Sequence, residues 1–188
     1  MRRRARWLSI IAHPFVMVVV MVGVSAATRQ PADEALRTVA VVVAFTVVPL
    51  LVLMIWQVRR GAWENVDASN RAERPMLYLV GGVALVALLA YVTLLRPQSF
   101  MVRGVIGTLG MLAVCTVATR WVKLSLHMAF GALAATALTL AGSAVGYVLV
   151  LMLPALAWAR LALNRHSVFE VAAGTIIGAA VGAAIHYF

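Results

Sequence analysis

Three short polar clusters, separated by long apolar segments, contain the residues of this chain that could do chemistry. Their members are Arg71 and Arg74; Lys123, Ser125 and His127; and Arg160, His166 and Glu170. Arginine and lysine side chains neutralise phosphoryl oxygens, whereas histidine can transfer a proton or attack phosphorus. The residue types therefore favour the binding and cleavage of a phosphate ester at a membrane surface.

The elements that must position these clusters are hydrophobic helices. Of the 188 residues, 64% are hydrophobic and only 12% are charged, whereas soluble domains average about one half and about one quarter. Long apolar runs between short charged clusters are typical of helices that cross a bilayer. The composition therefore predicts an all-α protein, a polytopic transmembrane helical bundle.

The apolar runs predict six to seven membrane spans. A span needs roughly 20 apolar residues, and the candidates cover residues 7–27, 38–57, 76–95, 104–119, 126–141, 143–158 and 171–188. The fifth and sixth candidates share one uncharged stretch that is too long for a single span, so we expect a hairpin near Gly142 and Ser143. The whole chain, 1–188, is expected to form a single membrane domain, with an N-terminal span and loop (1–37) before the core (38–188).

The first span has two interpretations. A basic N-terminus, an apolar segment at 15–24 and small residues at 25–27 resemble a signal peptide with a cleavage site. The apolar stretch also extends back to Trp7, and the basic cluster suits an anchor on the cytoplasmic side. The second interpretation is favoured, and both leave the order of the later spans unchanged.

Even-numbered spans all end on the same side of the membrane, so the three clusters are expected to share one face. With the N-terminus inside, the inside segments hold 12 of the 16 Lys and Arg residues and the outside segments hold 4. Because basic residues collect in cytoplasmic loops, this count predicts an integral membrane protein of the cell inner membrane whose N-terminus and cluster face are cytoplasmic. The formal charge of +10 is then explained by topology and by an anion site, and no nucleic-acid partner is expected.

The spacing within the clusters resembles the signatures of the type 2 phosphatidic acid phosphatase superfamily, the integral-membrane lipid phosphate phosphatases. Residues 160–170 follow the third signature, Ser-Arg, five residues, His, three residues, Asp. Residues 125–127, Ser-Leu-His, resemble the second signature, Pro-Ser-Gly-His, and residues 74–75 resemble the Arg-Pro that ends the first. The order of the three motifs and their common membrane face strengthen the resemblance, which identifies 38–188 as a phosphatase-like core.

Four positions depart from these signatures. They are Asp67 in place of lysine in the first, Leu126 in place of glycine in the second, and Ala159 and Glu170 in place of serine and aspartate in the third. A carboxylate at the first of these positions cannot hold an anionic phosphate. Arg71 or Lys123 could restore the missing positive charge.

The resemblance implies that His166 attacks phosphorus and forms a phosphohistidine, which water then hydrolyses. It also implies that His127 is the general acid that protonates the leaving alkoxide. Glu170 lies four residues after His166, so if the last helix begins near His166 the two side chains share a face. The carboxylate could then hold one ring nitrogen and leave the other to attack.

Phosphate binding is expected from the cationic residues around these histidines. Planar arginine side chains neutralise charge that grows in the transition state; the resemblance gives this role to Arg74 and Arg160, with Lys123 and Arg71 as further candidates. Ser125 is expected at the N-terminus of the fifth span, where its hydroxyl and unpaired N–H groups favour an anion. No acidic cluster has metal-ligand spacing, so we expect a metal-independent reaction without a cofactor.

The leading hypothesis is an enzyme, a phosphoric monoester or diphosphate hydrolase that acts on a lipid or isoprenoid phosphate. Two alternatives stay open, namely a lipid phosphotransferase with the same nucleophile and a catalytically weakened lipid-binding or transport protein. A membrane lipid is the expected partner in each case. The sequence predicts neither which lipid it is nor the oligomeric state.

Small residues in the last span predict close helix packing. Gly174, Gly178 and Gly182 recur at spacing four, which leaves one helix face smooth. We expect this face to pack within the chain instead of pairing two chains. Two histidines outside the clusters, His13 and His186, are assigned no chemistry.

Overall fold

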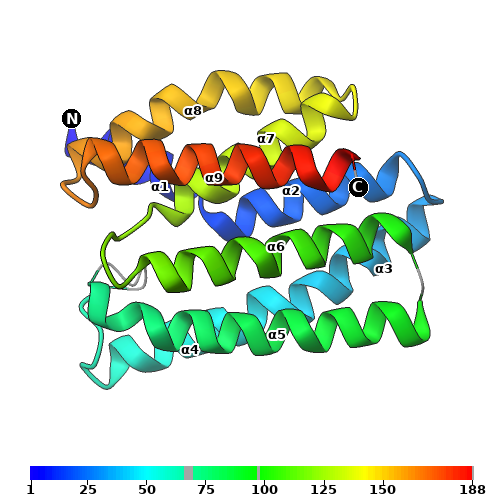
Figure 1. The fold of residues 1–188 in the computed structure, drawn as a ribbon, viewed down its shortest axis with the longest axis horizontal. Coiled ribbons are helices and arrows are strands. Elements are labelled where there is room, and N and C mark those ends of the chain that lie inside the picture. The colour runs from blue at the N-terminus through cyan, green and yellow to red at the C-terminus, as the bar shows by residue number, and fades with distance from the viewer. Residues whose placement is uncertain (66–69, 97, 188) are drawn as a thin grey trace. The chain divides into compact units, whose positions relative to one another are not determined.

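The computed structural model describes residues 1–65, 70–96 and 98–187, and the secondary structure in these ranges is helical without strands. Its elements, drawn in Figure 1, are α1 (Arg2–Ile11), α2 (Pro14–Ala27), α3 (Ala32–Val42), the π-helix η1 (Val43–Val47), α4 (Val48–Arg59), the 3-10 helix η2 (Arg71–Glu73), α5 (Arg74–Leu95), α6 (Ser99–Ala118), α7 (Leu126–Leu140), α8 (Ala144–Ala162) and α9 (Val168–Tyr187). The predicted all-α fold class is confirmed.

Six helical segments are long and apolar enough to cross a membrane. They are Arg2–Ala27, Ala32–Arg59, Arg71–Leu95, Ser99–Ala118, Ala144–Ala162 and Val168–Tyr187. The seventh apolar helix, α7, has only 15 residues. These helices confirm a polytopic membrane protein with six to seven spans.

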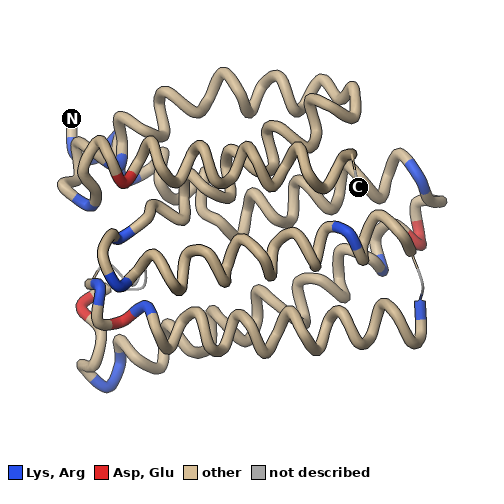
Figure 2. The backbone as a smooth tube through the Cα atoms, viewed as in Figure 1, with Lys and Arg blue, Asp and Glu red and all other residues tan. Residues whose placement is uncertain are grey.

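The chain forms two compact units. The first unit contains Met1–Val39 and Val122–Phe188, and the second unit contains Ala40–Trp121. In both units the charged residues lie mainly near helix ends and in the connections, whereas the middles of the helices are largely uncharged (Figure 2). This distribution suits a hydrocarbon environment, where a charge in mid-span is costly.

The short helix α7 is the centre of the first unit. It packs against α2, α8 and α9, and its buried residues are His127, Met128, Ala129, Gly131, Ala132, Leu133, Ala134, Ala135 and Leu138. A helix of this length spans about 22 Å, which is less than the roughly 30 Å of a bilayer core. Because neighbouring helices cover α7, it does not need the length of a lipid-facing span.

The glycine face of α9 packs directly on the backbone of α7. A Cβ atom built on Gly174 would lie 2.7 Å from the carbonyl oxygen of Ser125, which is closer than real Cβ contacts. Gly178 and Gly182 meet the backbone of α7 in the same way, at Ala129 and Leu133. The predicted packing of this glycine face within the chain is confirmed, and it fixes the start of α9 beside the start of α7.

The predicted hairpin between the fifth and sixth helical spans is present. Gly142 has a φ of 75°, and the N–H of Ser143 donates to the carbonyl of Leu138 at 2.9 Å, as in a glycine-terminated helix end. The hydroxyl of Ser143 then accepts from the N–H of Val145 at 3.3 Å and caps α8. The turn therefore returns the chain to the side on which α7 began.

The first span is broken, whereas the sequence analysis predicts one continuous segment. Pro14 lacks an N–H and disfavours helical backbone at the preceding residue, and His13 accordingly has extended dihedrals, φ −62° and ψ 144°. The Nδ1 atom of His13 accepts from the N–H of Phe15 at 3.3 Å, which caps α2. The separate helix α1 packs on α8 and buries Ala5 and Ser9.

The second unit is built on the pairing of α5 with α6. Buried residues recur every three or four positions along both helices, at Tyr78, Gly81, Leu85, Leu88 and Val92 on α5 and at Met101, Val105, Thr108, Met111 and Cys115 on α6. This spacing places one stripe of each helix in the contact. The start of α5 thereby lies beside the end of α6.

Candidate functional site

The eight predicted site residues are divided between the two units. Six of them belong to the first unit, namely Lys123, Ser125, His127, Arg160, His166 and Glu170, and the other two, Arg71 and Arg74, belong to the second unit. Asp67, which stands where the first signature has lysine, lies outside the described residues.

The turn between α8 and α9 sets the spacing of the third motif. Asn164 has a φ of 53°, a left-handed conformation that asparagine tolerates better than most residues. The N–H of Arg165 donates to the carbonyl of Arg160 at 3.1 Å, and the N–H of Asn164 donates to that of Leu161 at 2.9 Å. Five residues thus end α8, reverse the chain and bring His166 to the start of α9.

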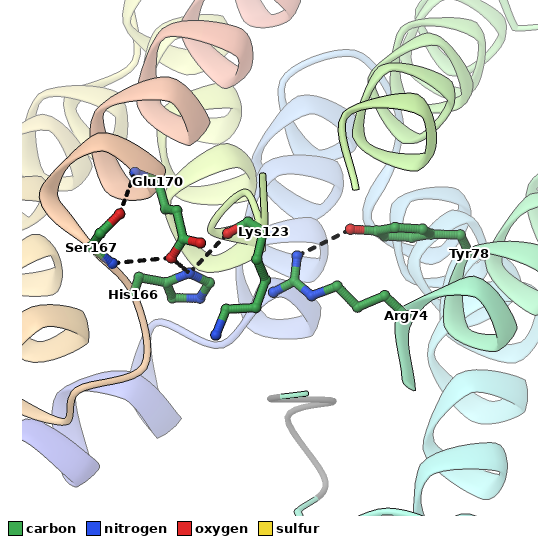
Figure 3. Close-up of polar contacts among 6 residues, drawn as sticks. All are labelled: Arg74, Tyr78, Lys123, His166, Ser167 and Glu170. Atoms are coloured by element: carbon green, nitrogen blue, oxygen red, sulfur yellow. Dashed lines mark hydrogen bonds and ion pairs between the residues drawn. The ribbon is translucent and has the colours of Figure 1, made fainter. Parts of the chain in front are cut away.

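A capping box begins α9 and positions Glu170. The N–H of Ser167 donates to Oε2 of Glu170 at 3.0 Å, and the N–H of Glu170 donates to the hydroxyl of Ser167 at 3.2 Å (Figure 3). This reciprocal pair is the Ser-x-x-Glu arrangement of helix N-termini. His166 therefore precedes α9, and its carboxylate partner reaches it by folding back at the cap instead of by sharing a helix face.

The imidazole of His166 is held through one nitrogen. Its Nδ1 atom lies 3.1 Å from Oε2 of Glu170 and 3.1 Å from the carbonyl oxygen of Lys123 (Figure 3). Both oxygens can only accept, so Nδ1 carries the proton, and in the neutral ring the lone pair is on Nε2. Only 3% of the side chain is exposed, so the ring is held in a defined orientation and tautomer.

The second motif contributes two buried polar atoms. Ser125 is the N-cap residue of α7, and its N–H donates to the carbonyl of Glu170 at 3.2 Å. The Ser125 hydroxyl is fully buried and has no hydrogen-bond partner among the described residues, and the same is true of Nε2 of His127. Buried polar atoms are normally paired; the described residues include two others of this kind away from the candidate site, Oε1 of Gln57 and Oγ1 of Thr139. What sets Ser125 and His127 apart is that both lie at the start of α7.

Arg160 is buried beside His127 in the first unit. Only 2% of Arg160 is exposed, and its Nη1 donates to the hydroxyl of Ser9 on α1 at 3.2 Å. The ring of His127 is hydrogen-bonded to the backbone of Ser9 and lies within electrostatic range of Arg160 and His166. The centroid of the His127 ring is 5.2 Å from that of His13 in an edge-to-face arrangement.

Two residues of the first span, Ser9 and His13, lie near His127 but are not among the site residues predicted from the sequence. Neither residue belongs to one of the three polar clusters, so the sequence gives His13 no chemistry and does not indicate Ser9. One signal was present, since a His-Pro pair inside an apolar run predicts a helix break. Ser9 and His13 are four residues apart on the two sides of that break, and both reach His127.

In the second unit, Arg74 is buried at the start of α5. It is 3% exposed, and its Nη1 donates to the hydroxyl of Tyr78 at 3.1 Å (Figure 3). The hydroxyl of Thr119, at the end of α6, lies 3.4 Å from the same Tyr78 oxygen. Tyr78 is a further residue that the sequence analysis misses, although its position one helical turn after Arg74 could have indicated it.

Arg71 precedes Arg74 by one short turn. It begins η2, and its Nε donates to the carbonyl of Thr119. This contact ties the loop before α5 to the end of α6. Arg71 therefore has a structural contact within the second unit, in addition to the phosphate binding predicted for it.

Glu73 caps η2 and the loop before it. Its Oε2 accepts from the N–H of Asn70 at 3.1 Å and its Oε1 accepts from the N–H of Glu64 at 3.0 Å. Two backbone donors thus compensate this buried carboxylate. Across the described part of the chain, no group of three or more His, Cys, Asp or Glu side chains could hold a metal ion.

Comparison with protein-family models, with curated proteins and with solved structures finds no match to this chain. The support for a function therefore comes from the residues and contacts of the two units.

Proposed function

We propose that this protein is a membrane phosphatase that hydrolyses a lipid or isoprenoid phosphate or diphosphate through a phosphohistidine on His166. The observation that carries the proposal is the pairing of Nδ1 with two acceptor oxygens, on Glu170 and Lys123. This pairing assigns the lone pair of the neutral ring to Nε2. The buried guanidinium of Arg160 belongs to the same unit.

In the first step, Nε2 of His166 attacks phosphorus and the bond from phosphorus to the alkoxide or phosphate leaving group breaks. The ring gains positive charge as the phosphohistidine forms. The carboxylate of Glu170, 3.1 Å from Nδ1, stabilises this charge and keeps the ring oriented. Water then attacks phosphorus, and the bond to Nε2 breaks, which regenerates the neutral ring.

Proton transfer is proposed for His127. Its Nε2 would donate a proton to the leaving oxygen in the first step and accept one from water in the second. A substrate oxygen would supply the hydrogen-bond partner that this buried nitrogen and the Ser125 hydroxyl lack among the described residues. Both atoms come from one end of α7, so a single phosphoryl group could satisfy them.

Charge neutralisation is proposed for the cationic side chains. Arg160 and Lys123 belong to the same unit as His166, and a guanidinium binds the phosphoryl oxygens more strongly as their charge grows. The motif resemblance extends this role to Arg74, and Arg71 is a further candidate for it. The basic count of 12 to 4 supports a cytoplasmic orientation of this face in a cell inner membrane.

The capping box also accounts for one departure from the family signature. Glutamate is the preferred residue at the third position of a capped helix because it reaches back to the N-cap N–H. Glu170 does so at Ser167 and also contacts His166 with the same oxygen. The replacement of aspartate by glutamate is therefore compatible with the proposed role.

Phosphate release by the detergent-solubilised protein tests the proposal. Phosphatidic acid and an isoprenyl diphosphate are supplied in EDTA, and His166→Ala is compared with His186→Ala, a histidine on an exposed stretch of α9. We expect release by wild type and by His186→Ala, and a loss of at least about 10³-fold in His166→Ala. Equal release by wild type and His166→Ala would exclude the nucleophile, and transfer of phosphate to an added alcohol would indicate the phosphotransferase.

A further inference from the structure

The broken first span brings a hydroxyl and a histidine ring to the proposed active site. Ser9 lies near the end of α1 and His13 caps α2. The Ser9 hydroxyl accepts from Nη1 of Arg160 at 3.2 Å. Its backbone is hydrogen-bonded to the ring of His127.

The surroundings of Ser9 make its hydroxyl contact with Arg160 significant. Ala5 and Ala12, which flank Ser9 on the same side of the helix, are buried, and so is Ala159 beside Arg160. A guanidinium as deeply buried as that of Arg160 depends on polar partners because desolvation penalises unpaired N–H groups. The Ser9 oxygen is one such partner, and it comes from a helix that is remote in sequence.

We propose that Ser9 is a positioning residue for the reaction proposed above, acting on two groups at once. Its hydroxyl orients the guanidinium of Arg160 toward the phosphoryl group, and its backbone orients the ring of His127. The proposal rests on the proposed function. It makes α1 part of the active site instead of a simple membrane anchor.

The expected effect is mainly on transition-state stabilisation. Charge on the phosphoryl oxygens grows as the transition state forms. A misoriented arginine therefore loses more interaction energy with these oxygens in the transition state than in the ground state. A hydrogen bond to a charged group contributes enough to change a rate by about tenfold. Loss of the Ser9 hydroxyl should therefore lower kcat more than it raises KM.

The test measures kcat and KM for phosphate release by full-length Ser9→Ala and Ser9→Thr. Ser143→Ala is the matched control, because it removes a serine hydroxyl at the other end of α8 from Arg160. We expect kcat/KM to fall about tenfold in Ser9→Ala, to stay within about twofold of wild type in Ser9→Thr, and to be unchanged in Ser143→Ala. Because Ser9 is proposed to act through Arg160, Ser9→Ala should add nothing in an Arg160→Lys background.

The outcomes separate this inference from the proposed function. If wild type releases phosphate, His166→Ala does not, and Ser9→Ala equals wild type, the positioning role is wrong and the proposed function stands. Additive effects of Ser9→Ala and Arg160→Lys, or equal losses in Ser9→Ala and Ser9→Thr with a lowered melting temperature, would also overturn the positioning role. If wild type releases no phosphate, the proposed function fails and the inference fails with it.

Discussion

Arg160 in the first unit and Arg74 in the second unit are buried arginines near helix ends, and each donates to a hydroxyl oxygen. One partner of Arg74 is Tyr78, one turn along the same helix. One partner of Arg160 is Ser9, which is 151 residues away in the sequence. The contact of Arg74 with Tyr78 is therefore set by local helix geometry, whereas the contact of Arg160 with Ser9 depends on the packing of α1 against α8.

Similar buried arginine contacts can thus depend on the fold to very different extents. Formation of α5 alone brings Arg74 to Tyr78, because residues four apart are neighbours on a helix surface. Arg160 gains its partner only when the first helix packs against the eighth. Substitutions that disturb packing should therefore affect the first unit more than the second.

The largest contrast is expected between two glycine substitutions. Gly178→Ala would place a Cβ atom against the backbone of α7 at Ala129, whereas a Cβ atom on Gly110 of α6 meets nothing within 4 Å. We expect Gly178→Ala to cost about 3 kcal/mol of stability and to abolish phosphate release, because α9 must move away from α7. Gly110→Ala should be neutral or slightly stabilising, since alanine favours helix by about 1 kcal/mol.

Thermal unfolding in detergent and phosphate release measure both glycine variants. A melting temperature of Gly178→Ala equal to that of wild type would show that α7 and α9 do not need their close contact.

The next contrast compares the two capping-box glutamates. Glu170→Gln keeps an amide oxygen for the Ser167 N–H but removes the charge beside His166, so kcat should fall by about 10- to 100-fold. Glu73→Gln makes the same change at the cap of η2, where the carboxylate accepts only from the N–H groups of Asn70 and Glu64 in the described contacts. It should leave kcat within about twofold of wild type.

Steady-state phosphate release at saturating substrate distinguishes the two glutamates. Equal losses of kcat in both variants would mean that the Glu170 charge has only a structural role.

A smaller effect is expected from the local partner of Arg74. Tyr78→Phe removes the hydroxyl that accepts from Arg74 and lies beside that of Thr119, so it should cost about 1–3 kcal/mol of stability. Because both contacts of the Tyr78 hydroxyl lie within the second unit, whereas Ser9 belongs to the first, the cost should be the same in wild type and in Ser9→Ala. Melting temperatures of the two single variants and of the double variant check this additivity, and a strong coupling would contradict the division into local and long-range support.

The smallest effects are expected at the two N-cap residues. Ser167→Ala removes the hydroxyl that accepts from the N–H of Glu170. Asn70→Ala removes the side-chain oxygen that accepts from the N–H of Glu73. Each should lower stability by about 1 kcal/mol. Only Ser167→Ala should also lower kcat, because Ser167 helps to hold Glu170 at His166; an equal kcat in both variants would show that Glu170 is positioned by other contacts.

Features with a local cause could be predicted from the sequence. The lengths of apolar runs indicate the spans, Gly142 and Ser143 indicate the hairpin, and the four-residue glycine spacing indicates a smooth face on the last helix that packs within the chain. That this face meets α7 comes from the structure alone. The Ser-x-x-Glu pattern at 167–170 is likewise a local signal for a helix start. Each of these depends on groups a few residues apart or on one helix face.

Features that depend on remote partners could not be predicted in this way. Periodicity shows that Ser9 lies in an apolar helix, but it does not show which of the other helices that face will meet. The contact with Arg160 depends on the angle introduced at His13 and Pro14 and on the packing of α1 against α8. For the same reason the sequence assigns no chemistry to His13, although its ring meets that of His127 in the structure.

The long separation between Ser9 and Arg160 also sets an order of assembly during synthesis. At about 5–20 residues per second, the ribosome adds the arginine roughly 8 to 30 seconds after the serine. During the later part of this interval the nascent chain has its first membrane helices but still lacks Arg160. The proposed site is therefore complete only after α9 has been made, and a truncated product that ends before α9 would occupy the membrane without the proposed activity.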